Sequence, residues 1–285
     1  MTRVALVAFV ALAGFPSSAP AQSMPLGEAL VFNIPDLKPD ADLAAFERYV
    51  ASAVAPAWNR AVPGMTLHLV RADRGSRKGQ YMLVWTVDTL ARWTAHAAPP
   101  GRSPFTPELR AKAGDFRAGF APFVNSGGQY HEYHLVAPET TGRLPDVEVL
   151  GIHYAKVGPE RQEGFERFVR SALHPAVANL RPDLRLLYYK SVRGAEAGSY
   201  ILVFALTKAS RDKYWPGGAD SAELRAAFSP QIRALTTELS TYLVEGSYAA
   251  DPKLAAPVFE SRDWTDFVVV APASSSPSPA EDRRP

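Results

Sequence analysis

The chain has 285 residues, of which 47% are hydrophobic and 21% are charged, and its 31 basic and 29 acidic side chains leave a net charge of +2. This hydrophobic fraction is typical of a folded domain with a buried core, and the balanced charges predict no nucleic-acid partner. The absence of cysteine excludes disulfide bonds, thiol catalysis and cysteine-ligated metals.

The first 21 residues have the layout of a secretory signal peptide. A short basic start precedes an apolar run at 4–15, and an A-x-A pattern at 19–21 follows as a cleavage site. The run is too short to cross the roughly 30 Å hydrocarbon layer of a membrane. We therefore expect cleavage after Ala21, a periplasmic or secreted mature protein, and no remaining membrane span.

From position 29 the chain alternates between strand and helix patterns. Apolar runs at 29–34, 65–72 and 81–87 are typical of strands, and a Gly- and charge-rich connection joins the last two like a hairpin loop. Between the first two runs, apolar residues recur at three- to four-residue spacing, which predicts a helix. Pro56 is expected to end or kink it, because proline removes a backbone donor. A second helix carrying Leu109, Phe116, Phe120 and Phe123 and a last strand ending in Val-Ala-Pro are predicted to follow.

The same order then returns. Over positions 46–85, sixteen of forty residues are identical to those 119 positions later, against two or three expected by chance. The shared residues include Arg74-Gly75, which recurs as Arg193-Gly194. We therefore predict a first repeat at 26–138 and a second at 146–272. The second repeat carries a long insert at 246–263, and a Pro/Ser-rich tail at 273–285 is expected to be disordered.

The predicted fold class is α+β, with two tandem ferredoxin-like βαββαβ repeats. The motif F-E-R-x-V-x-S-A-x-x-P-A at 165–176, followed by G-x-Y-x-L-V at 198–203, resembles the dimeric α+β barrel proteins, which include the antibiotic-biosynthesis monooxygenases and the chlorite dismutase relatives. The resemblance implies that the two repeats pack sheet to sheet around a cavity, as an intramolecular pseudo-dimer that we expect to be a monomer. It also implies binding of a small hydrophobic or aromatic ligand, with cofactor-free oxygenase activity or haem binding in that cavity.

Alternation along the strands divides their side chains between the helices and the shared interior. In the second strand, the apolar set Met65, Leu67 and Leu69 is assigned to the helices. In the last strands, Tyr133 and Leu135, like Phe267 and Val269, are also assigned to the helices. The side chains then predicted to line the interior as a ligand site are His68, His134, His153, Glu132, Asp266, Asn33, Arg185, Trp85 and Tyr189, with Phe204 beside them.

Several functions remain open at this point. A histidine near a carboxylate can shuttle protons, and a histidine can also be the axial ligand of a haem, as in some barrel relatives. No catalytic residue is predicted, and no metal site, because the rings of His131 and His134 in one strand would point to opposite faces. The pairs Glu47-Arg48 and Glu166-Arg167 are expected on solvated helix faces. The alternative to a ligand-binding protein is a non-catalytic structural or interaction module with a side-chain-filled barrel.

Overall fold

The computed structural model describes residues 24–99, 103–137, 146–177, 181, 183–194, 199–218, 220–227, 229–244 and 264–270. The predicted signal peptide, the insert at 246–263 and the C-terminal tail lie outside these residues. The strands are β1 Met24–Pro25, β2 Ala29–Leu37, β3 Met65–Gly75, β4 Tyr81–Val87, β5 Val124–Leu135, β6 Asp146–Val147, β7 Val149–Lys156, β8 Leu184–Arg193, β9 Ser199–Leu206 and β10 Trp264–Val269.

Eight of these strands close into an antiparallel barrel in the order β10-β3-β4-β2-β5-β8-β9-β7. The first repeat contributes β3-β4-β2-β5 and the second contributes β8-β9-β7-β10, each in the strand order of a ferredoxin-like sheet. Hydrogen bonds between β5 and β8 and between β10 and β3 join the two sheets edge to edge. The chain therefore has the dimeric α+β barrel fold, with both halves of the barrel on one polypeptide.

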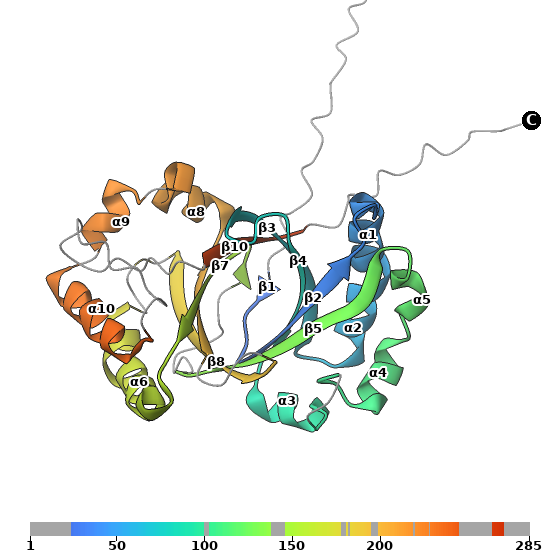
Figure 1. Ribbon diagram of the computed structural model, residues 1–285, viewed down its shortest axis with the longest axis horizontal. Coiled ribbons are helices and arrows are strands. Elements are labelled where there is room, and N and C mark those ends of the chain that lie inside the picture. The colour runs from blue at the N-terminus through green and yellow to red at the C-terminus, as the bar shows by residue number, and fades with distance from the viewer. Residues whose placement is uncertain are drawn as a thin grey trace, which may run out of the picture.

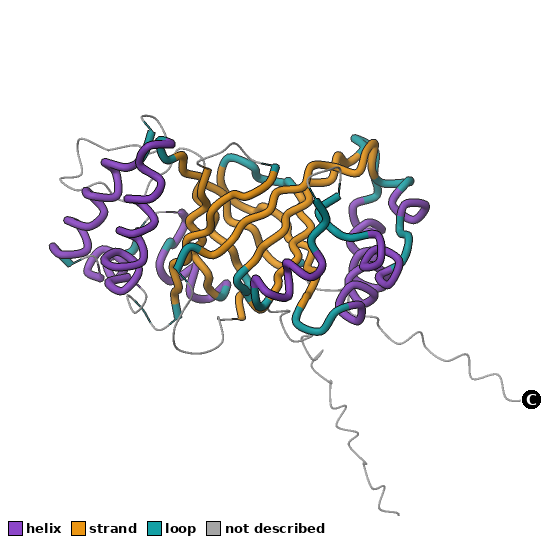
Figure 2. Tube along the Cα trace, turned by 90° about the horizontal axis from the view of Figure 1, so that it is seen from below, coloured by secondary structure: helices purple, strands orange, loops and turns teal. Residues whose placement is uncertain are grey.

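The helices of the two repeats flank the barrel on opposite sides, as Figures 1 and 2 show. Those of the first repeat are α1 Leu43–Tyr49, α2 Ala55–Ala61, α3 Leu90–His96, α4 Pro107–Ala113 and α5 Arg117–Phe120. Those of the second are α6 Gln162–Phe168, α7 His174–Val177, α8 Lys208–Tyr214, α9 Ala222–Ala227 and α10 Pro230–Tyr242, with 3₁₀ turns at Pro159–Arg161 and Pro216–Gly218.

The first helix of each repeat does not end at its proline. A π-helical turn, η1 Val50–Val54, precedes Pro56 in the first repeat. The corresponding turn, η3 Val169–Leu173, precedes Pro175 in the second. The amide of Ala55 donates to the carbonyl of Val50, one residue further back than in an α-helix, so the ladder accommodates a residue without a donor. The helix then continues as α2, and Trp58 on this continuation is buried. The single second helix predicted for each repeat is also wrong, because each is divided into shorter helices.

Three clusters of buried side chains hold the fold together. One lies between helices and sheet in each repeat, and the third fills the barrel with side chains from both repeats. The third cluster includes Leu30, Phe32, Leu187 and Phe267, each at most 2% exposed. Met24 and Val147, from the short β1–β6 pair, belong to the same cluster. The interior lined by the described residues is therefore largely filled by apolar side chains.

A partly buried glutamate connects the first helix to the sheet in each repeat. Glu47 accepts a hydrogen bond of 2.5 Å from the hydroxyl of Tyr81, and Glu166 accepts one of 2.9 Å from Tyr200. Lys190 also pairs with Glu166, at 2.8 Å. The expectation of a solvated helix face is thus wrong for both glutamates, and their sheet contact accounts for the glutamate and tyrosine found in both copies.

Candidate functional site

Three of the predicted interior residues face the barrel. On β3 and β8, the helix-facing set is the one expected, so His68, Arg185 and Tyr189 are on the barrel side. His68 is 8% exposed, and its Nε2 lies 3.1 Å from the hydroxyl of Thr66. The hydroxyl of Tyr189 is buried and donates to the carbonyl of Gly27 at 2.9 Å. Both side chains are thus part of the packed interior.

The other predicted interior residues lie on the helix side of the sheet, so their assignment is wrong. Tyr133, Leu135, Phe267 and Val269 belong to the barrel cluster, which turns the alternate residues of β5 and β10 outward. The assignment failed because both faces of these strands are buried, and alternation cannot distinguish two buried faces. The residues that move to the helix side are Glu132, His134, Asp266, Asn33, His153, Trp85 and Phe204.

Glu132 is the centre of one polar cluster on this side, in the first repeat. Its Oε1 accepts hydrogen bonds from Trp93 Nε1 at 2.5 Å and from His134 Nε2 at 2.7 Å. Arg193 Nε lies 3.1 Å from Oε2, within ion-pair distance but without the alignment of a hydrogen bond. Burial alone would raise the pKa of Glu132. The hydrogen bonds from His134 and Trp93 and the charges of His134 and Arg193 outweigh it, so the pKa is lowered.

Arg193 reaches this cluster from the other repeat, across the β5–β8 seam. The register shifts there, with Tyr133 opposite Ser191 and Glu132 opposite Arg193, so Val192 is an extra residue. The other seam has the same shift, with Phe267 opposite Ala72 and Asp266 opposite Arg74. Each bulge places an arginine beside the acid on the other repeat's last strand. We did not predict this role for either arginine, although their recurrence as Arg-Gly was a signal in the sequence.

Asp266 is the counterpart of Glu132 in the second repeat, but its surroundings are different. Position 93 of the first repeat corresponds to Arg211 on α8, counted from the capping residues Thr89 and Thr207. Arg211 pairs with Asp73 at 2.6 Å and with Asp212 at 3.1 Å. Arg74 pairs with Asp212 at 3.0 Å. The two arginines near Asp266 are thus engaged by other carboxylates.

The Asp266 carboxyl itself has no hydrogen bond among the described residues. Burial raises its pKa to about 6, and the neighbouring charges of Arg211, Asp73, Arg74 and Asp212 oppose one another. His153 lies on the neighbouring strand and the same face, and burial lowers its pKa to about 4. An acid that titrates near neutrality thus lies near an uncharged imidazole, which is a pattern of acid–base sites.

A glycine and several aromatic side chains complete this Asp266 site. Gly151 stands opposite Asp266 on β7, and a Cβ there would lie 3.2 Å from Asp266 Oδ1 and 3.3 Å from the Phe204 side chain. The first repeat has Val31 at the equivalent position. The centre of the Phe204 ring lies 5.1 Å from that of His153 and 5.6 Å from that of Trp215. The Trp264 ring stacks over His153 with 6.5 Å between the ring centres. Aromatic walls with few polar groups are typical of small-molecule sites.

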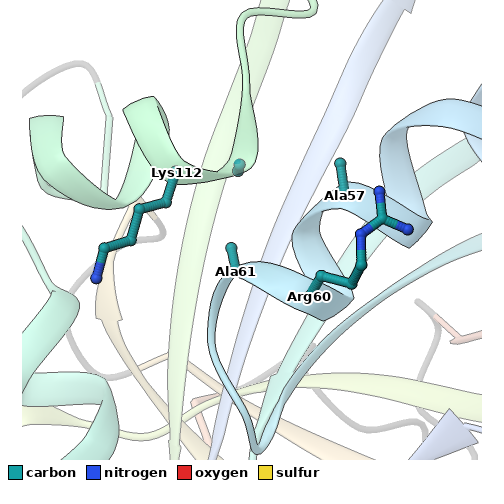
Figure 3. Close-up of a pocket in the computed structure, with 5 residues that line it drawn as sticks. Ala57, Arg60, Ala61 and Lys112 are labelled. Atoms are coloured by element: carbon teal, nitrogen blue, oxygen red, sulfur yellow. The ribbon is translucent and has the colours of Figure 1, made fainter.

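A separate groove of about 490 Å³ lies between α2 and α4, lined by Ala57, Arg60, Ala61, Lys112 and Ala113. Figure 3 shows the side chains of Arg60 and Lys112 extending away from each other. The two cations do not converge on one point, so the groove lacks the arrangement of an anion site.

Haem does not fit the three histidines predicted for the interior. An axial ligand needs an imidazole nitrogen that faces an open slot of porphyrin size. His68 is enclosed in the packed barrel, His134 bonds Glu132, and His153 is flanked by Phe204 and Trp264. We therefore derive no chemistry through haem.

No protein-family model matches the sequence, and a search of curated proteins finds no match. Among solved structures, a candidate monooxygenase from Fusobacterium nucleatum is similar, with 11% identity and a TM-score of 0.49 over 87% of this chain and 94% of that one. A candidate monooxygenase from Lactobacillus acidophilus has 10% identity and a TM-score of 0.47 over 85% and 92%. A dye-decolorizing protein from V. cholerae has 8% identity and a TM-score of 0.42 over 87% and 95%.

None of the described helices is long and apolar enough to cross a membrane.

Proposed function

We propose that the mature chain is an exported protein that binds a planar, weakly acidic aromatic molecule at the Asp266 site and removes a proton from it. The observation that carries this proposal is a partly buried carboxyl with a pKa raised to about 6 and no hydrogen-bond partner among the described residues. Such a group is mostly ionised at pH 7, yet basic enough to accept a proton from a phenol or an activated carbon. This places the site outside the barrel, against the sheet of the second repeat.

The residues around Asp266 have separate roles in this proposal. Phe204, Trp215 and Trp264 flank the ring of the ligand, and Gly151 lets the Asp266 carboxyl and Phe204 lie close against the strand. His153 is uncharged at neutral pH and exchanges a hydrogen bond with a ligand oxygen. These residues bind, orient and deprotonate, which leaves an electron-rich anion in a largely dry site.

The reaction class proposed for that anion is oxidation by molecular oxygen without a cofactor. An activated CH₂ group loses a proton to Asp266, and the carbanion reduces O₂ and forms the carbon–oxygen bond. Loss of the second C–H proton with O–O cleavage then gives a carbonyl and water, so CH₂ and O₂ become C=O and H₂O. Binding and proton abstraction are the steps for which this chain supplies residues.

The proposal can be tested with 4-nitrophenol, whose anion absorbs near 400 nm, because the protonation state of the bound phenol is visible directly. The ionised Asp266 carboxylate disfavours a second negative charge beside it, so we expect the mature protein to raise the apparent pKa of the bound phenol. A panel of phenols and quinones should raise the melting temperature. Gly151→Ala and Asp266→Asn should each weaken binding, the second with loss of the pKa shift. Val31→Ala, the matched change in the first repeat, should leave binding unchanged.

Two results would contradict this function. Ligand effects that survive in Asp266→Asn would exclude that residue as the base. If no compound in the panel raises the melting temperature, the non-catalytic module becomes the better description, in agreement with the filled barrel. Added haemin is expected to produce no Soret shift.

A further inference from the structure

Polar side chains gather at the end of the barrel near the turn between β3 and β4. His131 and Tyr133 on β5 and Ser191 on β8 face the barrel, as their pairing with Phe32 and with one another shows. Tyr154 on β7 packs against the same interior. Arg77, in the turn, holds its guanidinium 4.0 Å from the centre of the Tyr154 ring.

Two of these side chains have buried polar atoms without a hydrogen bond to any part of the chain that the structure describes. They are Nδ1 of His131 and the hydroxyl of Ser191, and Ser191 is only 7% exposed. Leaving such a group without a partner costs about 1–3 kcal/mol, so most buried polar atoms have one. His131, Tyr154 and Arg77 also remain partly exposed, which keeps this end of the barrel accessible from solvent.

The duplication indicates that packing alone does not require this polarity. The strand pairings of the two repeats can be aligned. Each of the four barrel-facing residues then has a counterpart in the other repeat, at the same end of the barrel. Every counterpart is less polar or smaller: His131 corresponds to Thr265, Tyr133 to Phe267, Ser191 to Ala72, and Tyr154 to Ile34. Thr265, Phe267 and Ala72 are buried with at most 2% exposure, so the smaller or less polar side chains also pack well.

We propose that this end of the barrel is a second binding site, for a small carboxylate. The Arg77 guanidinium supplies the positive charge, and the Ser191 hydroxyl and the His131 ring nitrogen donate hydrogen bonds to the carboxylate oxygens. Phe32, opposite His131, and Ile34 on the same strand are the apolar neighbours for a short hydrocarbon or aromatic group. The site lies on the barrel face of the sheet, whereas Asp266 lies on the helix face, so it does not depend on the function proposed above.

Benzoate is the probe for this site, with benzamide as its uncharged counterpart. At a hundredfold excess over its dissociation constant, benzoate should raise the melting temperature by about 5 °C. His131→Thr and Ser191→Ala copy the counterparts of the other repeat, so we expect both to fold and each to weaken benzoate binding about tenfold. Arg77→Gln should abolish the preference for benzoate over benzamide.

Asp266→Asn is the control, because it should remove the pKa shift of bound 4-nitrophenol and leave benzoate binding intact. Three results would overturn this inference: no stabilisation by benzoate at 20 mM, equal stabilisation by benzamide, or binding that is unchanged in His131→Thr and Ser191→Ala. A crystal structure with benzoate that shows only water against Ser191 and His131 would overturn it as well.

Discussion

Glu132 and Asp266 occupy equivalent positions, yet the fold treats their charges in opposite ways. Glu132 is 4% exposed and has two hydrogen-bond donors, so its charged form is favoured and its pKa is lowered. Asp266 has no hydrogen-bond donor among the described residues, so burial disfavours its charge and raises its pKa. Carboxyl groups whose pKa is raised by burial are found preferentially at functional sites, which is consistent with a role for Asp266.

Asp266→Asn should therefore stabilise the protein, and only above acidic pH. The folded state binds the Asp266 proton more tightly than the unfolded state, so the wild type loses stability as pH rises from about 4 to above 6. A shift from 3.8 to about 6 corresponds to up to about 3 kcal/mol, which partial exposure reduces to about 2 kcal/mol. Urea unfolding at pH 8 and pH 4 measures this. Glu132→Gln is the control and should destabilise at pH 8; a destabilised Asp266→Asn at pH 8 would contradict the assignment.

For single residues, the sequence predicted which side chains belong to polar clusters better than it predicted which face of the sheet they occupy. Glu132, His134, His153 and Asp266 were selected from the sequence and are all in polar or aromatic clusters of the structure. Their predicted face was wrong, because the barrel interior is as apolar as the helix side and the bulges shift the register. Arg74 and Arg193 lie far in sequence from Asp212 and Glu132, as Arg211 does from Asp73. Only the repeated Arg-Gly pair therefore pointed to a shared role.

The elements that join the repeats are the two β-hairpins whose first strands are β3 and β8. An Arg-Gly pair lies at the end of each of these first strands, where the turn begins. Its glycine, Gly75 or Gly194, has a φ angle of +93° or +84°, respectively. A Cβ on Gly75 would lie 2.2 Å from the carbonyl oxygen of Trp264, and one on Gly194 would lie 1.9 Å from that of Tyr130. These glycines let each hairpin approach the last strand of the other repeat, which brings the neighbouring arginine into position.

Gly75→Ala should therefore destabilise the barrel by at least about 3 kcal/mol, since it adds a backbone clash at a seam to an unfavourable φ angle. Gly79→Ala in the same hairpin is the matched control. Gly79 also has a positive φ, of +90°, but nothing lies within 4 Å of its added Cβ, so we expect a cost of about 1–2 kcal/mol. Equal losses for the two variants in urea unfolding would show that the close approach at the seam is not required.

The order of the elements was predictable, because the repeat supplied each pattern twice. The predicted strands at 29–34, 65–72 and 81–87 agree with β2, β3 and β4. Proline was a poor guide to helix ends, since a π-helical turn absorbs Pro56 and Pro175 in a way that local patterns do not reveal. The second helix failed because its apolar residues belong to several short helices, whose separate starts depend on tertiary packing.

At the scale of the whole molecule, the duplication has produced one structural unit. Both sheets contribute to the barrel cluster, and both seams are hydrogen-bonded ladders. Each repeat supplies about half of the side chains in the barrel cluster. A single repeat would therefore expose the apolar face of its sheet to water. The two repeats should therefore unfold together, although each has its own cluster beneath its helices.

Leu202→Ala tests this coupling, because Leu202 is fully buried in the helix-side cluster of the second repeat alone. The truncation should cost about 2–5 kcal/mol. If the barrel unfolds as a unit, the free energy of opening measured by amide hydrogen exchange should fall by the same amount in β4 of the first repeat and in β9. Leu83→Ala, the equivalent change in the first repeat, should have the reciprocal effect on β9. Protection of β4 that is unchanged by Leu202→Ala would show that the halves open independently, and the shared barrel would then not be the cooperative unit.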